Sequence, residues 1–197
     1  MMRRCVKIRP GGATTMSNIL ILYTSIEGQT SRIVEHMAKT LGQIGHRVEA
    51  LRADDQRVDP QLSRFDGVIV GASIHYGHHP DYLLALLRRH RQALESRPNA
   101  FFSVSLSGGG PGARPKTAQR YLDKFQRKVG WQPQQTASIG GALQYSKYAP
   151  WKKWIMTKIV GFAGGDTDTT RDYEYTDWQA VAEFASIFAQ RMEPKSR

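Results

Sequence analysis

The sequence predicts an α/β fold in which helices cover both faces of a doubly wound, five-stranded parallel sheet. Short apolar runs alternate along the chain with segments whose apolar residues fall on one helical face. Strands that alternate with helices form parallel sheets, because each crossover helix returns the chain to the same end of the sheet. The length of 197 residues suits one such domain with a sizeable core.

Five short apolar runs are predicted to be the strands. The first of them, NILILY, has the composition of a strand that is buried on both faces of a parallel sheet. The third and fourth runs are followed by polar loops that contain Gly. The predicted strands cover residues 18–23, 46–51, 66–70, 100–106 and 136–143.

Helical periodicity predicts four helices that connect or follow these strands. Gly45 suits the C-terminal cap of the first helix, and Asp177 suits the N-terminal cap of the last. The predicted helices cover residues 30–44, 80–94, 116–129 and 178–191.

The composition restricts the classes of function. A formal net charge of +11 is too basic for a typical acidic electron carrier, and it indicates an anionic partner: nucleic acid, an anionic membrane surface or a polycarboxylate substrate. Cys5 is the one cysteine, so a disulfide framework or a cysteine-based metal site within one chain is excluded. No apolar run reaches the roughly 18 residues of a membrane-spanning helix, so any membrane contact is expected to be peripheral.

The chain is expected to form one domain with a short tail at each end. Residues 1–15 include four basic residues and no acid, and the first apolar run begins just after Met16. We expect this segment to be a disordered tail, or Met16 to be the natural start. The domain is expected at residues 16–192 and a C-terminal tail at residues 193–197.

The phosphate loop, residues 24–30, joins the first strand to the first helix and is a candidate anion site. Its backbone N–H groups and the helix N-terminus attract anions, and Gly28 allows a close approach. Without a Walker A ending or a GxGxxG pattern, the loop fits a phosphate monoester best; an ordinary strand–helix turn is the alternative. Glu27 is negatively charged, so its side chain is expected to point away from a bound anion.

Two other loops are expected to meet the phosphate loop at one edge of the sheet. Residues 71–77 follow the third strand and residues 105–112 the fourth, and the carboxyl ends of such strands share one crevice. Tyr76 is placed to stack on a planar ring. A receiver domain has the same topology but needs carboxylates where this chain has Thr24-Ser25 and Gly71-Ala72, which argues strongly against that class.

The 144–173 segment separates the fifth strand from the last helix, where a minimal domain needs only a few residues. Residues 145–163 include four lysines and no acid, and apolar residues recur there at helical spacing. This composition is typical of a basic amphipathic helix that lies in a membrane surface. Packing of its apolar side on the parent domain is the alternative. The apolar residues are Trp151, Trp154, Ile155, Ile159 and Phe162.

Five stretches of the sequence resemble a known family. The stretch ILYTSIEGQT, which spans the first strand and the phosphate loop, resembles flavodoxins in general. Together with GASIHYGHH, IGGALQY, GGDTDT and YTDW, it resembles more narrowly the flavodoxin-like, quinone-dependent protoporphyrinogen IX dehydrogenases of Gram-negative bacteria. The expected fold is therefore a flavodoxin-like sheet with a long insertion after or within the fifth strand.

The resemblance implies FMN as the cofactor and oxidation of protoporphyrinogen IX to protoporphyrin IX, a late step of haem synthesis. It implies that electrons pass to a membrane quinone, either menaquinone or ubiquinone. The enzyme would be cytoplasmic and bound peripherally to the inner face of the cell membrane, with the anionic membrane surface as a partner and no nucleic acid. The helix within the 144–173 segment would then be a lid for a planar tetrapyrrole with propionates, or a membrane contact.

The resemblance also implies which residues form the site. The phosphate loop would surround the FMN phosphate, and the other two loops would contact the rest of the cofactor. The third loop has no aromatic residue, so an uncovered flavin face would leave room for a flat substrate. The residues implied to bind FMN are Thr24, Ser25, Ile26, Glu27, Gly28, Gln29, Thr30, Ala72, Ser73, Ile74, His75, Tyr76, Gly77, Ser105, Leu106, Ser107, Gly108 and Gly109. The candidates for substrate or membrane contact are Lys147, Tyr148, Trp151, Lys152, Lys153 and Trp154.

Three histidines, His75, His78 and His79, follow the third strand. No cysteine or acid is spaced to complete a metal site with them, so no metal is predicted. His75 is a candidate for accepting protons during oxidation or for neutralising charge at flavin N1, and exposed loop histidines are the alternative. The sequence identifies no residue as an established catalyst. The acidic stretch GGDTDT is expected to form turns and cap backbone groups rather than bind Ca²⁺.

Three other functions are alternatives to this one. A flavodoxin-type electron carrier would favour a large acidic face, whereas this chain is basic. An FMN-dependent NAD(P)H:quinone reductase needs a nicotinamide site, for which no motif is evident. A nucleic-acid binder is least favoured, because the basic residues are dispersed over several elements.

Overall fold

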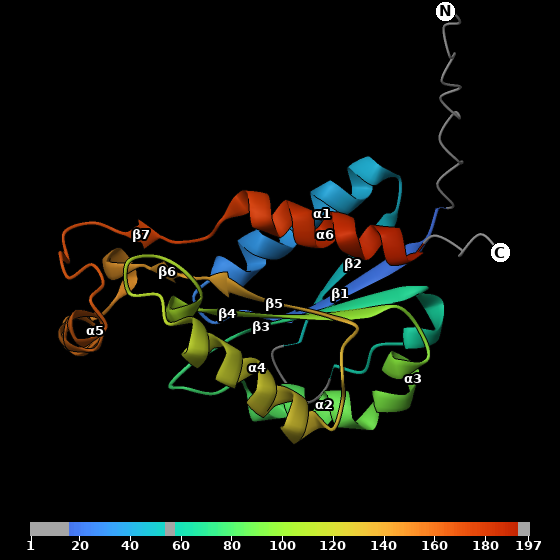
Figure 1. Cartoon of the computed structure of the whole chain (residues 1–197), viewed down its shortest axis with the longest axis horizontal. Helices are drawn as coiled ribbons and strands as arrows, with labels where there is room; N and C mark the ends of the chain where they lie inside the picture. Colours follow the sequence, from blue (N-terminus) through green and yellow to red (C-terminus); the bar gives the residue numbers. More distant parts are fainter. Residues whose placement is uncertain (1–15, 54–57, 193–197) are drawn as a thin grey trace, which may run out of the picture.

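Figure 1 shows a computed structural model of the chain, which describes residues 16–53 and 58–192. The expectations for residues 1–15 and 193–197 lie outside the described residues. A central sheet is covered by helices on both faces, as the sequence predicts.

The sheet has five parallel strands in the order β2-β1-β3-β4-β5. In its register, Ile21 of β1 lies between Ala50 of β2 and Ile69 of β3. The strand order reverses between β1 and β3, which is where doubly wound sheets bind ligands. The strands are β1 (Asn18–Thr24), β2 (Arg47–Arg52), β3 (Gly67–Ser73), β4 (Asn99–Ser105) and β5 (Gln135–Gly140).

Helices α1 and α6 pack side by side on one face of the sheet, and α2, α3 and α4 cover the other (Figure 1). Gly45, with φ of 109°, caps α1, and the Asp177 carboxylate accepts a hydrogen bond from the backbone N–H of Ala180 in α6. Both predicted caps are therefore confirmed. The bounds are α1 (Gln29–Ile44), α2 (Asp81–Arg89), α3 (Arg91–Glu95), α4 (Pro115–Val129) and α6 (Trp178–Met192), with short 3₁₀ turns at Leu62–Arg64 and Leu106–Gly108.

Each face of the sheet has its own apolar core. Below α2 and α4, the rings of Phe101 and Phe125 stack with centroids 3.8 Å apart, and Trp131 packs against both at a steep angle. The other core contains Ile33 of α1 and Phe188 of α6. Truncating a buried aromatic residue costs about 3–5 kcal/mol. These cores therefore hold the strand ends in fixed positions.

The structure corrects two predicted boundaries. The predicted helix 80–94 is two helices, because His90 leaves helical geometry at φ −99° and ψ 10° and its imidazole bonds to Asp59. The predicted strand 136–143 ends at Gly140, and Ala142–Leu143 forms a separate strand, β6. β6 pairs antiparallel with β7 (Tyr173–Glu174), so the chain leaves the main sheet there to form a second, two-stranded sheet.

The 144–173 segment folds beyond the end of β5, where α5 (Pro150–Phe162) lies with β6 and β7 at one end of the molecule (Figure 1). A 3₁₀ turn, Tyr145–Lys147, precedes α5. A small apolar cluster of Leu143, Tyr145, Tyr148 and Val160 forms its core. In the described part of the chain, no helix is both long and apolar enough to cross a membrane.

Candidate functional site

The phosphate loop connects the end of β1 to the first turn of α1. Gly28 is the N-cap of α1 at φ 94°, a left-handed conformation that favours glycine. No side chain caps this helix end, and its first turn contains no acid. The N–H groups at the start of α1 therefore remain available to an anion. The backbone N–H of Ser31 donates to the Ser25 hydroxyl, at 3.3 Å, and holds the loop against the helix.

Four buried hydroxyl groups lie at the carboxyl ends of the strands or at the start of α1. They have no hydrogen-bond partner among the described residues, although buried hydroxyls in proteins are nearly always paired. Thr30, Ser73 and Ser105 line one pocket, where their hydroxyls can bind a polar ligand. The hydroxyls belong to Thr24, Thr30, Ser73 and Ser105.

A pocket of about 380 Å³ opens between the three loops and α5. It brings together most of the residues that the sequence predicts for the site. From that set, the lining includes Ile26, Glu27, Gln29, Thr30, Ser73, Ile74, His75, Tyr76, Gly77, Ser105, Leu106, Ser107, Tyr148, Trp151 and Lys152. The lining also includes Ile155 and Ile159, which the sequence predicts on the apolar side of the 144–173 helix. Sequence reasoning missed five further lining residues: Val104, Tyr121, Gly141, Ala142 and Met156.

Some predicted residues do not line the pocket. Thr24, Ser25, Gly28 and Ala72 lie in or beside the loops, behind the lining residues, whereas Lys147, Lys153 and Trp154 lie on the 144–173 segment outside the pocket. Tyr121 on α4 carried no sequence signal, because its helical spacing is that of an ordinary amphipathic helix.

The second loop forms a tight two-residue turn that presents an aromatic ring. His75 and His78 exchange backbone hydrogen bonds, while Tyr76 and Gly77 both have positive φ, at 48° and 79°. This is the geometry of a type I′ turn, in which a non-glycine residue such as Tyr76 is held only at some cost. The Tyr76 ring is 73% exposed at the pocket, where it can stack on a flat ligand.

The glycines of the third loop serve close packing instead of lining the pocket. A side chain at Gly108 would collide with the backbone oxygen of Ile139, and one at Gly109 would collide with that of Tyr175. Gly108 and Gly109, predicted to bind the cofactor, are absent from the lining. Only Leu106 and Ser107 of the loop, with Ser105 at the end of β4, face the pocket.

Glu27 of the phosphate loop is bound to the 144–173 segment. One carboxylate oxygen lies 2.6 Å from Lys152 Nζ, and the other accepts a hydrogen bond of 2.7 Å from the Tyr148 hydroxyl. Burial, together with the hydrogen bond to Glu27, raises the pKa of Tyr148, so its hydroxyl stays protonated and donates. Glu27 is among the residues that line the pocket, and its carboxylate is directed to Tyr148 and Lys152. The expectation that it points away from a bound anion stays a prediction.

A second set of contacts joins the start of α1 to residues that directly follow the 144–173 segment. The Gln29 amide donates to the Thr176 hydroxyl at 2.8 Å. Arg32 forms an ion pair of 2.6 Å with Glu174 of β7. The phosphate loop is therefore held from two directions by the residues that follow β5.

The apolar side of α5 is exposed, not packed on the parent domain. Val160 is the one buried residue among those of α5. Trp151, Ile155 and Ile159 line the pocket and also face solvent, whereas Trp154 and Phe162 are 66% and 87% exposed outside it. The alternative in which this side packs on the domain is therefore wrong.

Comparison with known proteins places this fold in a family. Residues 20–170 match the family described as flavodoxin domain. The chain belongs to the flavodoxin-domain family. Among solved structures, it is similar to oxidised flavodoxin 1 from Bacillus cereus, with a TM-score of 0.50, 16% identity and coverage of 90% of this chain and 100% of that one. A short-chain flavodoxin associated with a bacterial microcompartment gives a TM-score of 0.53 at 10% identity, covering 90% of this chain and 100% of that one. Both likenesses concern the fold.

Two other relatives share more of the sequence. The chain is 36% identical over 171 residues to a protoporphyrinogen IX dehydrogenase (quinone) from Escherichia coli strain K12, covering 86% of this chain and 93% of the relative. It is 33% identical over 178 residues to a protein of the same name from Leishmania major, covering 90% of this chain and 77% of the relative. The resemblance seen in the sequence is confirmed, and the chain groups with oxidoreductases.

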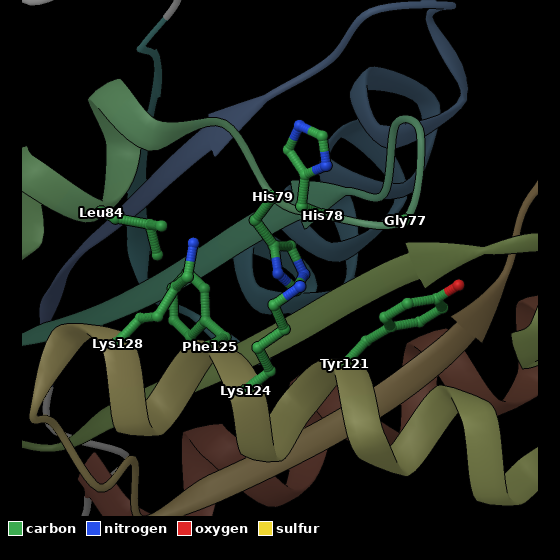
Figure 2. Close-up of a pocket in the computed structure, with 8 residues that line it drawn as sticks. All are labelled: Gly77, His78, His79, Leu84, Tyr121, Lys124, Phe125 and Lys128. Atoms are coloured by element: carbon green, nitrogen blue, oxygen red, sulfur yellow. The ribbon is translucent and has the colours of Figure 1, made fainter.

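The three histidines after β3 differ sharply in environment. His75 lines the main pocket, and burial lowers its pKa, so it is mostly uncharged at neutral pH. His79 instead points toward α4 into a second cavity of about 10 Å³ (Figure 2). Its Nε2 lies 2.9 Å from the Ser103 hydroxyl, and its ring packs against Phe101 and Phe125.

The acidic stretch GGDTDT forms turns, as expected. Asp168 accepts hydrogen bonds from the backbone and hydroxyl of Thr170, which lower the pKa of its carboxyl. The Asp166 carboxylate accepts a hydrogen bond of 2.6 Å from Tyr175. Among the described residues, no three of His, Cys, Asp or Glu are grouped as a metal site would require.

His79 predicts a pH dependence of stability. Burial lowers the pKa of His79 from 6.5 to about 3, so between these values the unfolded chain binds the proton and the folded protein does not. The stabilisation is complete above pH 6.5 and decreases as the pH falls, by at most about 1.4 kcal/mol per pH unit. Urea unfolding between pH 7 and 5 should show a smaller slope for His79→Gln than for the wild-type protein.

The neighbouring histidine provides the control for that measurement. His78 is exposed, and its charge contributes less than burial to the lowered pKa of His79, so His78→Gln should keep most of the wild-type slope. A His79→Gln variant with the full wild-type slope would show that other groups cause the acid sensitivity.

Proposed function

We propose that this protein oxidises protoporphyrinogen IX to protoporphyrin IX with FMN as cofactor and passes the electrons to a membrane quinone. The observation that carries the proposal is the pocket of about 380 Å³, in which a helix N-terminus and unpartnered hydroxyls face an exposed apolar helix. The relatives in E. coli and L. major, which bear this activity in their names, support it. The reaction would be a late step of haem biosynthesis.

The residues present fit FMN. The phosphate loop would hold the phosphate through the N–H groups of α1 and the Thr30 hydroxyl. The hydroxyls of Ser73 and Ser105 would take polar atoms of the isoalloxazine, and Tyr76 would stack on its ring. FMN, when bound, would supply the exchange of electrons and hydride between substrate and quinone.

The chain itself would bind and orient the flat substrate. Trp151, Ile155 and Ile159 give the pocket an apolar wall from α5, while the third loop leaves one side of the site free of aromatic residues. Lys147 and Lys153, which lie on either side of the start of α5, would attract the substrate's propionates. His75, uncharged and at the pocket, would accept a proton released during oxidation.

The exposed residues of α5 support peripheral binding to the cytoplasmic face of an anionic membrane. Trp154 and Phe162 project outside the pocket, and the helix carries three lysines and no acid. Aromatic side chains and lysines on one helix favour the interface between headgroups and acyl chains. Such a position would bring the pocket to a quinone dissolved in the membrane.

The function is tested with the purified protein, loaded with FMN and incubated without oxygen with protoporphyrinogen IX and a soluble menaquinone analogue. Porphyrin fluorescence should rise well above the autoxidation control, and only when both FMN and quinone are present. The proposal would be contradicted if NAD(P)H or another donor reduced the flavin while the porphyrinogen stayed unchanged. That result would favour a quinone reductase or an electron carrier.

Thr30→Val tests the cofactor site. The substitution keeps the shape of the side chain and removes a buried hydroxyl that has no partner among the described residues. FMN affinity should fall about tenfold, because the variant loses one hydrogen bond to the anionic phosphate. Stability without FMN should stay equal or rise, as measured by urea unfolding. Thr40→Val, whose hydroxyl bonds to the carbonyl of His36, is the control and should bind FMN like the wild-type protein.

Trp154→Ala combined with Phe162→Ala tests the membrane contact. Wild-type protein should sediment with phosphatidylglycerol vesicles and much less with phosphatidylcholine vesicles. The double variant should lose about tenfold or more of that affinity, because two exposed aromatic anchors are removed. Ile187→Ala, an exposed residue of α6, is the control and should bind normally. Equal vesicle binding by the double variant would exclude α5 as the contact.

A further inference from the structure

The phosphate loop contains one charged residue, and that residue is an acid. Glu27 directly precedes Gly28, the N-cap of α1, in a loop that otherwise offers backbone N–H groups, hydroxyls and the Gln29 amide as donors. A carboxylate beside a bound phosphate is unfavourable, because like charges repel. The presence of an acid at this position therefore needs a compensating partner.

Two side chains of the 144–173 segment compensate the charge of Glu27. Lys152 and Tyr148 each bind one oxygen of the Glu27 carboxylate, at 2.6 and 2.7 Å. Lys152 also lies over the Tyr148 ring, 4.2 Å from its centroid. The side chains of Lys152 and Glu27 are 24% and 29% exposed, so solvent screens this pair less than a fully exposed one.

Few other contacts fix the position of α5. Val160 is its one buried residue, and Met156 packs against the same small apolar cluster. Thr157 forms a hydrogen bond with Tyr145, and at the far end of α5 Arg114 donates to the carbonyl of Phe162. Tyr148 is itself anchored, because it is buried against Tyr145 in the small apolar cluster. The carboxylate of Glu27 thus joins a fixed point on the phosphate loop to a helix that is otherwise lightly held.

We propose that Glu27 is a positioning residue that holds α5 over the pocket, and that Lys152 neutralises its charge so that the same loop can bind the FMN phosphate. The inference rests on the proposed function, since it takes the phosphate loop as the FMN site. Through this ion pair, binding of a phosphate to the loop is linked to the position of α5, the apolar wall that would face the substrate.

Substitution of Lys152 and substitution of Glu27 should have different effects on FMN affinity. Lys152→Met leaves the Glu27 charge uncompensated, so FMN affinity should fall about five- to tenfold at low ionic strength. This loss should shrink at high salt, which screens the repulsion. Glu27→Gln removes the charge, so FMN affinity should not fall. The double variant Glu27→Gln/Lys152→Met should regain most of the affinity that Lys152→Met loses.

A separate experiment tests how firmly α5 is held. It measures the rate of hydrogen exchange of the Pro150–Phe162 amides in the protein without FMN. Both Glu27→Gln and Lys152→Met should exchange these amides several times faster than the wild-type protein, while α1 and α6 stay unchanged. Lys158→Met is the matched control: Lys158 lies on the same helix, is exposed, and has no described carboxylate within ion-pair distance. It should leave both readouts as in the wild-type protein.

Three results would overturn the inference. A double variant that binds FMN as weakly as Lys152→Met would show that Lys152 acts on the ligand without Glu27. An equal loss of affinity in Lys158→Met would show a general effect of positive charge. Unchanged exchange of α5 in Glu27→Gln would show that the carboxylate does not hold the helix. Wild-type protein that binds no FMN would instead refute the proposed function, and the charge compensation with it.

Discussion

The carboxylate of Glu27 connects the two parts of this molecule that form the site. One part is the doubly wound sheet, whose buried strands place the phosphate loop beside the second and third loops. The other is the 144–173 segment, which has a small core of its own and presents α5 to the pocket. Because α5 buries little apolar surface, its position depends on polar contacts with the loop.

The site therefore combines a rigid half and a lightly held half. The rigid half is built from strands that are buried on both faces, with stacked aromatic residues such as Phe101 and Phe125 beneath them. Loops at the ends of such strands keep their geometry and suit the recognition of a phosphate and a flat ring. The lightly held half exposes Trp154 and Phe162, which suits contact with a large apolar substrate or with a membrane.

The sequence predicted the parts of the fold that depend on local patterns. Buried strands are continuous apolar runs in the sequence. Helix caps such as Gly45 and Asp177 are recognised from the residue type at the helix end. The break at His90 and the end of the fifth strand at Gly140 escaped prediction, because both depend on distant residues. His90 bonds to Asp59, and Gly140 packs closely against Tyr175.

The sequence predicts the site residues that lie at the ends of strands. It does not predict the contacts between segments that are far apart in the chain. The glycines of the third loop were interpreted as cofactor contacts, since composition alone cannot distinguish close approach to a ligand from close packing on Tyr175. The role of Glu27 was also missed, because its partners lie 121 and 125 residues further along the chain. His75 and His79 look alike in sequence, and only the β3–α2 connection places one at the pocket and the other in the core.

Recognition of a phosphate monoester by the loop between β1 and α1 is tested most directly by comparing the binding of FMN with that of riboflavin. Both compounds carry the same isoalloxazine, so titration of the protein without bound flavin isolates the contribution of the phosphate. We expect one FMN to bind per chain, and riboflavin to bind about 100-fold more weakly, because it lacks the several charge-assisted hydrogen bonds that the phosphate makes. Equal affinity for the two compounds would contradict the assignment of this loop as the phosphate site.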